Sequence, residues 1–158
     1  MMATRIRPFR PSDASFVVSL ATRFSEFRLP EWRSRSEIDE FFRKKLEAVP
    51  DRLGPEEAIL IAEEESGEPV GFVHVLTEPD HFNGRKGALI SDVAVTKSRE
   101  GQGIGPRLLE AAEDWARETG CDLASLYVFE GNLGARRMYE RHGFGPEVLL
   151  YVKRVRPT

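Results

Sequence analysis

The chain has 158 residues, 41% hydrophobic and 31% charged, which fits one domain spanning residues 1–158 with a core large enough to fold alone. Its formal net charge of −3 lacks the basic excess of a general nucleic-acid binder, so we expect no nucleic-acid partner. One cysteine excludes an intrachain disulfide, three scattered histidines predict no metal site, and the lack of a signal-like or membrane-spanning apolar run predicts a cytoplasmic protein with no membrane partner.

The first half of the chain predicts a short strand, two amphipathic helices and a β-hairpin. Apolar residues that recur at helical spacing indicate the helices. Two apolar runs on either side of the turn-forming sequence ESGEP indicate the hairpin. The predicted ranges are a strand at 4–7, helices at 13–24 and 37–49, and a hairpin at 58–76, followed by a loop at 77–87.

The second half predicts strands that alternate with helices. The ranges are a buried strand at 88–95, a helix at 106–119, a strand at 122–129, a short helix at 132–142 and a last strand at 147–155. The strand-helix-strand unit in the middle requires a right-handed parallel crossover, whereas the hairpin before it is antiparallel. The order β-α-α-β-β-β-α-β-α-β therefore predicts an α/β fold with a mixed, twisted sheet and helices on both faces.

Three glycines at alternate positions, Gly101, Gly103 and Gly105, lie in SREGQGIGPRLLE where the helix at 106–119 begins. A helix start exposes amides without internal partners and carries partial positive charge. Glycine lets an anion approach such amides closely, so a phosphate group is the expected ligand. A tight turn with no ligand is the alternative. The spacing fits neither GxxxxGK[ST] nor the dinucleotide-binding GxGxxG with its acidic partner.

A second pattern lies in VFEGNLGARRMYERHGF, residues 128–144. Asn132 is suited to cap the short helix, and helical spacing places Asn132, Ala135 and Tyr139 on one face. A tyrosine at such a position is more often a core aromatic whose hydroxyl is satisfied. Its meaning therefore depends on the glycine segment that precedes it.

Taken together, DVAVTKSREGQGIGPRLLE and LYVFEGNLGARRMYERHGF resemble motifs A and B of the GNAT superfamily of acetyl-CoA-dependent N-acetyltransferases. The closest matches cover residues 88–152, and IRPFRPSD and VGFVHV fit the first half more weakly. The resemblance implies a GNAT-like three-layer fold with a splayed central sheet. It also implies an acyltransferase that uses acetyl-CoA and no metal, in which a primary amine attacks the thioester directly.

The resemblance implies roles for individual residues. The amides of the glycine segment would hold the coenzyme A pyrophosphate, and the backbone of the preceding strand would pair with the pantetheine arm. Tyr139 would donate a proton to the departing thiolate, which suits a phenol that stays protonated at neutral pH. The residues implied in coenzyme binding are Val93, Ala94, Val95, Arg99, Gly101, Gln102, Gly103, Ile104, Gly105, Asn132 and Ala135.

The chain departs from the family pattern at two positions. Glu100 stands where the family usually has Gln or Arg. Because a carboxylate beside a pyrophosphate is unfavourable, we expect Glu100 to point to solvent and Arg99 to supply the cation. Pro106 lacks an N–H and so removes one possible donor, although it suits a first helical turn. These departures predict slightly weaker coenzyme affinity.

The general base and the acceptor are less defined. Asp92 is a candidate base, with a hydrogen-bonded structural carboxylate as the alternative, and His74 is expected to be a packed imidazole. Other candidate bases are Glu26, Glu31, Glu130 and a chain of waters. By family analogy the acceptor pocket lies between the segment that joins the first two helices, residues 24–35, and the loop at 77–87, where aromatic and acidic residues suit a cationic amine. Those residues are Phe24, Phe27, Trp32, Glu26, Glu31, Asp80, His81 and Phe82.

Other classes of function and the state of assembly stay open at this point. The acceptor is a small-molecule amine or a peptide N-terminus. The same fold could serve as a sensor or assembly module that binds acyl-CoA without turnover, and a nucleotide-binding protein is a third class. The apolar sequence VLLYV in the last predicted strand also suggests pairing across the two-fold axis of a homodimer.

Overall fold

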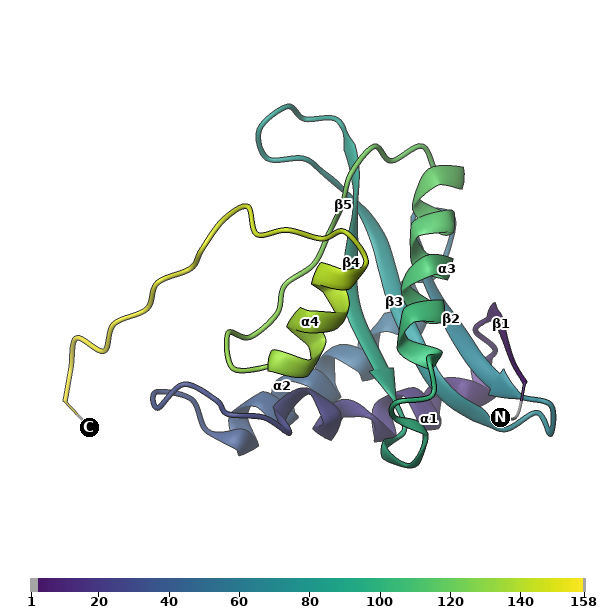
Figure 1. Cartoon of the computed structure of the whole chain (residues 1–158), viewed down its shortest axis with the longest axis horizontal. Coiled ribbons are helices and arrows are strands. Elements are labelled where there is room, and N and C mark those ends of the chain that lie inside the picture. The colour runs from purple at the N-terminus through teal and green to yellow at the C-terminus, as the bar shows by residue number, and fades with distance from the viewer. Residues whose placement is uncertain (1–2, 158) are drawn as a thin grey trace.

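The backbone forms an open five-stranded sheet in the strand order β1-β2-β3-β4-β5 (Figure 1). The computed structural model describes residues 3–157. Its strands are β1 (Thr4–Pro8), β2 (Glu57–Glu64), β3 (Pro69–Pro79), β4 (Lys86–Val95) and β5 (Ala124–Ser125). Strands β1 to β4 pair antiparallel, and β5 pairs with β4 in parallel. The mixed α/β sheet and the antiparallel hairpin are thereby confirmed.

Helices cover both faces of this sheet. α1 (Ala14–Ser19) and α2 (Arg35–Ala48) pack on one face, α3 (Ile104–Glu118) packs on the other, and α4 (Leu133–Arg141) lies beside the β4–β5 edge (Figure 1). Ser34 caps α2 by accepting a hydrogen bond from the Glu37 amide at 3.2 Å, so this helix begins earlier than predicted. The remaining helical segments are the 3-10 turns η1 (Pro11–Asp13), η2 (Ala21–Ser25), η3 (Val49–Arg52) and η4 (Lys97–Arg99).

The helix predicted at 13–24 is interrupted at Leu20, which is a correction to the sequence prediction. The Ser19 hydroxyl donates to the Phe16 carbonyl at 2.6 Å, and a side-chain bond of this kind competes with the helical backbone pattern. The chain then continues as the tighter 3-10 turn η2. The apolar spacing runs through this break, which explains why periodicity did not reveal it.

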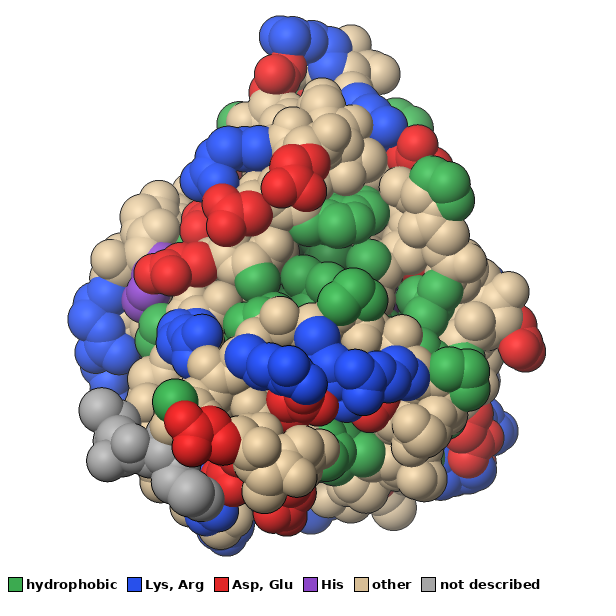
Figure 2. All heavy atoms as spheres, turned by 90° about the vertical axis from the view of Figure 1, so that its right-hand side faces the viewer, with side chains coloured by type: hydrophobic (Ala, Val, Ile, Leu, Met, Phe, Trp, Pro, Cys, Tyr) green, Lys and Arg blue, Asp and Glu red, His purple; other side chains and the backbone are tan. Residues whose placement is uncertain are grey.

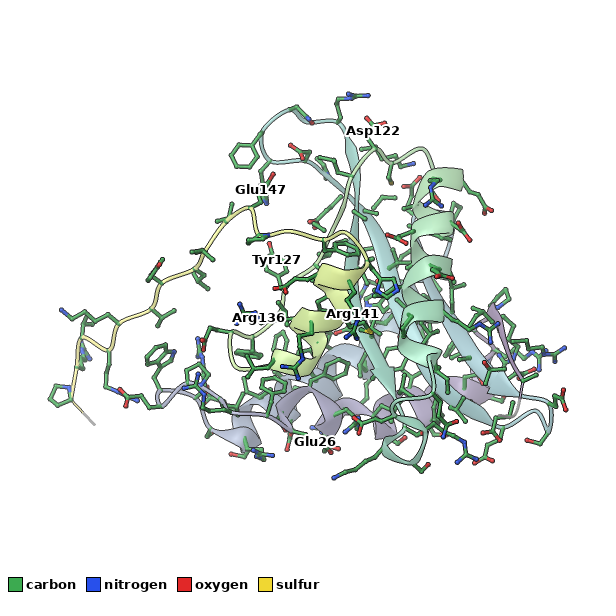
Figure 3. The ribbon with its side chains drawn as sticks, in the orientation of Figure 1. Glu26, Asp122, Tyr127, Arg136, Arg141 and Glu147 are labelled. Carbon is green, nitrogen blue, oxygen red and sulfur yellow. The ribbon has the colours of Figure 1, made fainter. Side chains whose placement is uncertain are left out.

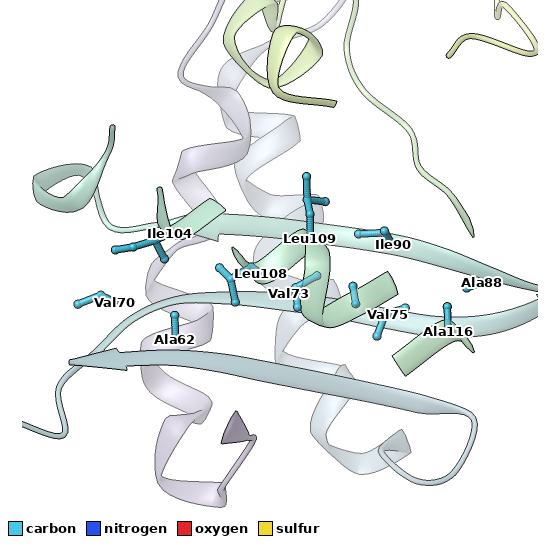
Figure 4. Packing of buried hydrophobic residues seen from close by; sticks show 11 residues of the cluster. Ala62, Val70, Val73, Val75, Ala88, Ile90, Ile104, Leu108, Leu109 and Ala116 are labelled. Carbon is cyan, nitrogen blue, oxygen red and sulfur yellow. The ribbon is translucent and has the colours of Figure 1, made fainter. Parts of the chain in front are cut away.

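Two hydrophobic cores hold the helices against the sheet. The core under α3 comprises Ala62, Val70, Val73, Val75, Ala88, Ile90, Ile104, Leu108, Leu109, Ala112 and Ala116 (Figure 4). On the opposite face Phe72 is fully buried beneath α1 and α2. Phe24 stacks there on Phe42 with ring centroids 4.5 Å apart. Phe24 is therefore a core residue rather than part of the predicted acceptor pocket.

The central sheet opens between β4 and β5. Only two pairs join them, Ala88 with Ala124 and Leu89 with Ser125, so the strands part over the remaining length of β4. A register shift between β3 and β4 next to His74 bends β4 at the point where it leaves β5. The predicted strand at 122–129 is therefore only two residues long, whereas the splay that the family resemblance implied is present.

The strand predicted at 147–155 is not formed in this structure. Residues 146–157, called the arm below, run as an extended segment away from the sheet (Figure 1). A β-strand requires a neighbouring strand for its backbone hydrogen bonds, and none of the described strands pairs with the arm. The final β in the predicted order is thus a correction, because the arm lies away from the sheet and pairs with none of its strands.

The side of the molecule away from the arm carries a mixed surface. Figure 2 shows hydrophobic side chains gathered in the middle of this face, above a row of Lys and Arg side chains. Within residues 3–157 no helix has both the length and the apolar character needed to cross a membrane.

Candidate active site

The glycine segment forms a loop whose amides are available to a ligand. Gly101 and Gly103 have positive φ angles of 74° and 79°, a region that favours glycine. A Cβ atom at either position would have no atom within 4 Å, so the space in front of this backbone is open. Among the backbone hydrogen bonds of residues 3–157, none is donated by an amide from Gly101 to Gly105. This loop therefore has the donors and the clearance that an anion such as a pyrophosphate needs.

The start of α3 also favours an anion at the glycine loop. Gly103 is the N-cap of this 15-residue helix, and its first turn has no acidic residue, so the positive end of the helix dipole faces the loop. Pro106 lies in the first turn, where an N–H would have no helical partner in any case. A Cβ at Gly105 would lie 3.0 Å from the Met138 sulfur, which shows how closely α4 packs against the loop.

The charges around the loop agree with the prediction only in part. Arg99 forms an ion pair with the buried Glu64, so its guanidinium is held on the β2 side. Glu100 is exposed, as predicted, and also forms an ion pair with Arg23. Arg23 also donates from Nε to the Val95 carbonyl oxygen at 3.0 Å. Sequence reasoning missed Arg23 because it comes from η2, far from the motif along the chain.

The last residues of β4 present backbone groups to the splay. The Thr96 amide donates to the Val70 carbonyl at 2.8 Å, so Thr96 faces β3. Because neighbouring residues of a strand face opposite edges, Val95 and Val93 direct their N–H and C=O groups away from β3, whereas Ala94 faces it. Two of the three residues implied in pantetheine pairing therefore face the opening, and the Val95 carbonyl is engaged by Arg23.

Tyr139 lies on α4 with its ring partly buried between helix and sheet. Asn132 caps α4 by accepting a hydrogen bond from the Ala135 amide at 3.3 Å, which is the ordinary structural role that the sequence offered. The Tyr139 ring packs edge-on against Phe144, with centroids 6.1 Å apart, and contacts the core under α3. Burial raises the pKa of Tyr139 to about 12, and the negative charge of Asp92 adds to this effect.

Asp92 belongs to a buried network of charged side chains. One carboxylate oxygen lies 2.8 Å from His74 Nδ1, and the other accepts from Lys45 Nζ at 3.0 Å. His74 Nε2 lies 2.7 Å from a Glu57 carboxylate oxygen. The ring of His74 therefore bridges the carboxylates of Asp92 and Glu57. Glu57 is bridged in turn to Arg52 at the surface.

This environment argues against Asp92 as a direct proton acceptor. Its side chain is 0% exposed. Burial works to raise the pKa of Asp92, but the hydrogen bond with His74 and the positive charge of Lys45 outweigh it and hold the pKa below its usual range. The cross-strand pairing of His74 with Asp92 lies next to a register shift between β3 and β4, and Lys45 comes from α2, so neither contact could be read from the sequence.

The segment after η2 lies against the loop that precedes α4. Phe27 and Phe129 have ring centroids 5.6 Å apart, and Arg28 pairs with Glu130 at 3.0 Å. A Cβ at Gly131 would lie only 2.1 Å from the Arg28 carbonyl oxygen, so glycine is required for this approach. One side of the predicted acceptor region, the segment after η2, is thereby joined to residues 129–131, which the prediction did not include in that region. Glu26 lies at the lower edge of this region in Figure 3 and pairs with Arg23.

The loop between β3 and β4 is not brought to this region. It carries Asp80, His81 and Phe82 and precedes the first residue of β4, whereas Arg23 bonds to the last one. Ten strand residues separate these ends, about 30 Å of strand, and Figure 1 shows the loop at the opposite end of the sheet from residues 26–33. The predicted pocket between these two segments is therefore not formed.

Comparison with known proteins gives a consistent result. The model of the acetyltransferase (GNAT) family matches residues 20–144. The uncharacterized N-acetyltransferase YhfO of Bacillus subtilis (strain 168) is 29% identical over 141 residues, 88% of each chain. The aminoglycoside N(6')-acetyltransferase type 1 of Stenotrophomonas maltophilia is 29% identical over 127 residues, 78% of this chain and 74% of its own.

Solved structures share the fold. A protein from Pyrococcus furiosus assigned as an acetyl transferase superposes with a TM-score of 0.77 at 28% identity, covering 97% of this chain and 100% of its own. AAC(6')-Iy, solved with the bisubstrate analog CoA-S-monomethyl-acetylneamine, has a TM-score of 0.70 at 19% identity, covering 96% and 99% of the two chains. The second likeness shows the fold alone.

Proposed function

The chain belongs to the acetyltransferase (GNAT) family and is an acyltransferase, and on that premise we propose that it transfers an acetyl group from acetyl-CoA to a primary amine. The observation that carries this proposal is the run of five residues, Gly101 to Gly105, at the start of α3, whose amides donate no backbone hydrogen bond and which leaves open space at Gly101 and Gly103. The alternative is an acyl-CoA sensor or assembly module with the same fold.

The glycine loop fits the diphosphate of coenzyme A by its donors, its clearance and its dipole. In the proposed complex Gly101, Gln102, Gly103, Ile104 and Gly105 hold the pyrophosphate, and the outward backbone groups of Val93 and Val95 receive the pantetheine arm. Acetyl-CoA supplies the activated thioester. Arg23 has to release the Val95 carbonyl for this pairing, which places its guanidinium near the anionic end of the ligand.

Tyr139 is proposed to stabilise the sulfur that leaves. A pKa of about 12 lies roughly 3.5 above that of an ordinary thiol, so complete proton transfer costs about 5 kcal/mol before other charges act. The hydroxyl therefore acts first as a hydrogen-bond donor, and this bond strengthens as negative charge develops on sulfur. Asn132 and Ala135, on the same helix face, are proposed to contact the coenzyme.

Asp92 is proposed to be a positioning residue that acts on its neighbours and does not itself accept the proton. Because its carboxylate is buried and bonded to Lys45 and His74, it orients these two side chains, and its negative charge favours the protonated form of Tyr139. Loss of a proton by the amine is then assigned to solvent or to the exposed carboxylates of Glu26 and Glu130, which border the contact between Phe27 and Phe129.

The acceptor is proposed to be a small-molecule amine or a peptide N-terminus. By their names, the Stenotrophomonas maltophilia relative acts on an aminoglycoside, and a Brucella melitensis protein with the same fold acts on a ribosomal-protein alanine. The aromatic and acidic residues after η2 suit a cationic ligand of either kind. A cytoplasmic location is proposed on the ground of the single cysteine.

The decisive experiment measures thiol release from acetyl-CoA in the presence of a panel of amines. The panel contains aminoglycosides, polyamines, amino acids and short peptides with free N-termini. Release with one class of amine supports the enzyme and identifies its acceptor. Tight coenzyme binding without release for any amine would favour the sensor.

Coenzyme A is expected to stabilise the folded chain, whereas NAD and ATP are not. At a concentration 100 times its Kd, a ligand that binds only the folded state adds about 2.7 kcal/mol to the free energy of unfolding. For a chain of this size that corresponds to a rise in Tm of about 5–11 °C. A thermal-shift measurement checks this. Stabilisation by NAD or ATP alone would overturn the assignment.

Gly103→Ala is expected to weaken coenzyme A binding about tenfold, or 1.4 kcal/mol. The new Cβ enters the open space in front of the loop, and its positive φ of 79° becomes strained. Gly120→Ala is the matched control, because Gly120 has a φ of 88° at the other end of α3. Calorimetric titration should show weakened binding in the first variant only. Equal Kd values for both would remove the loop from the binding site.

A further inference from the structure

The arm has the composition of a buried strand but lies in solvent. Five consecutive apolar residues, 148–152, have exposed fractions between 41% and 89%, with Leu150 the most exposed. None of the backbone hydrogen bonds between elements that involve residues 3–157 includes the arm. An exposed apolar run with unpaired backbone groups marks a surface that another chain covers.

A second unpaired feature lies at the edge of the sheet. β5 is the last strand in the sheet order, so its outer edge has no neighbour among the described strands. The Leu123 carbonyl accepts from the Ala88 amide, so Leu123 faces β4 and Ala124 faces outward. Pairing with a further strand would extend the same alternation beyond β5, to Leu126 and Val128. The surface beside this edge is apolar, and the Tyr127 side chain on it is 82% exposed.

We propose that the arm of one molecule pairs with the β5 edge of a second copy of the chain, and that the exchange is reciprocal in a two-fold dimer. The arm of each molecule supplies the strand that the other lacks, and the outward N–H and C=O groups of residues 124–128 receive it. Each contact occurs twice because the interface is symmetric. The inference stands on exposure and strand geometry, independently of the proposed chemistry.

The course of the chain favours a second copy over the molecule's own edge. After the turn at Gly143, Pro146 fixes its own φ and favours an extended conformation at Gly145, so the arm starts as an extended segment. Figure 1 shows the arm running away from β5. In Figure 3, Glu147 at the start of the arm lies to the left of the sheet, as Tyr127 does. Short hinges of this kind favour exchange between molecules.

The composition of the arm also favours a second copy as the partner that covers it. A strand with one face in water alternates apolar and polar residues, whereas residues 148–152 read VLLYV without a polar residue. Such a strand is covered on both faces. A second copy brings its own helices to the arm and so covers the face that a single edge position leaves open.

The exchanged arm would border the acceptor region. The β5 edge continues directly into Phe129, whose ring contacts Phe27 at 5.6 Å between centroids. A strand from the second copy would therefore wall the side of this region that the chain leaves open, next to the segment 26–33.

Sedimentation velocity on two complementary variants tests the exchange. The first ends at Gly145 and keeps the edge but lacks the arm, and the second, Val128→Pro, keeps the arm but loses an outward amide of the edge. We expect the full chain to be a dimer and each variant alone to be a monomer. An equimolar mixture should form a heterodimer, because one arm and one intact edge are then present.

Controls keep the result interpretable. Circular dichroism establishes that each variant is folded, and Leu150→Glu with Tyr151→Glu removes the apolar run without shortening the chain should the truncation fail to fold. Glu147→Gln, outside the run, should leave the dimer intact. A full chain that is monomeric at 100 µM (about a hundredfold above micromolar affinity), or dimers that survive both variants, would overturn the inference whatever the enzymatic activity.

Discussion

Tyr139→Phe is expected to lower kcat by about 10²–10⁴-fold while the affinity for coenzyme A stays unchanged. The substitution removes only the hydroxyl, and the ring keeps its edge-on contact with Phe144. If the hydroxyl stabilises the departing sulfur, its loss is felt in the transition state and not in binding of the ground state. Steady-state kinetics with the best amine, together with titration by coenzyme A, measure the two effects separately.

Tyr127→Phe is the matched control for this prediction. Its side chain is solvent-exposed beside β5, so kcat should stay within about twofold of wild type. With the pKa of Tyr139 near 12, the phenol remains protonated across the working range, and no fall in rate from its ionisation is expected below about pH 11. A Tyr139→Phe enzyme with unchanged kcat would assign the hydroxyl a structural role.

The local part of the site could be predicted from the sequence because neighbouring residues build it. The glycine segment precedes an amphipathic run, so its position at the start of α3 follows from helix capping alone. The same holds for Asn132, whose capping role was readable from its place before α4. The glycine segment lies within one strand-loop-helix unit, and Asn132 lies at the start of one short helix. In such local units, residues that are close in the sequence are also close in space.

The rest depends on contacts between segments that are distant in sequence. Arg23 engages Val95 and Glu100 only because η2 turns toward the end of β4. Lys45 reaches Asp92 from α2, and no periodicity in either segment indicates this pair. Secondary structure was misjudged where a strand needs a partner, since the apolar patterns at 122–129 and 147–155 are typical of strands but their pairing is decided elsewhere.

A further set of buried charges lies at the start of the fold and governs its stability. Arg7 donates to both carboxylate oxygens of Asp13, at 2.8 and 2.9 Å, and from Nε to Glu63. The Arg7 side chain is 10% exposed, and the two acids are almost fully buried. Through these bonds Arg7 joins β1, β2 and the turn that begins α1, which carries the chain toward Arg23.

Arg7→Ala is expected to lower the free energy of unfolding by about 3 kcal/mol, because it leaves two buried carboxylates without their shared cation. Arg5→Ala is the matched control. Arg5 also pairs with Glu63, but its side chain is 69% exposed, and Arg7 remains to balance the acid, so a loss of about 1 kcal/mol or less is expected. Urea denaturation at neutral pH gives both values.

The same network predicts how stability changes with acid. Hydrogen bonds from Arg7 hold the pKa of Asp13 and of Glu63 below their usual ranges, although burial opposes this. A carboxyl whose pKa is lower in the folded state stabilises the fold above its unfolded pKa, and this contribution is lost as pH falls below about 4. Arg7→Ala should therefore flatten the acid limb of the stability curve as well as lower its plateau. A variant that lost stability at neutral pH but kept the full acid dependence would show that other carboxylates, such as Asp92, set that limb, and that Arg7 acts through packing alone.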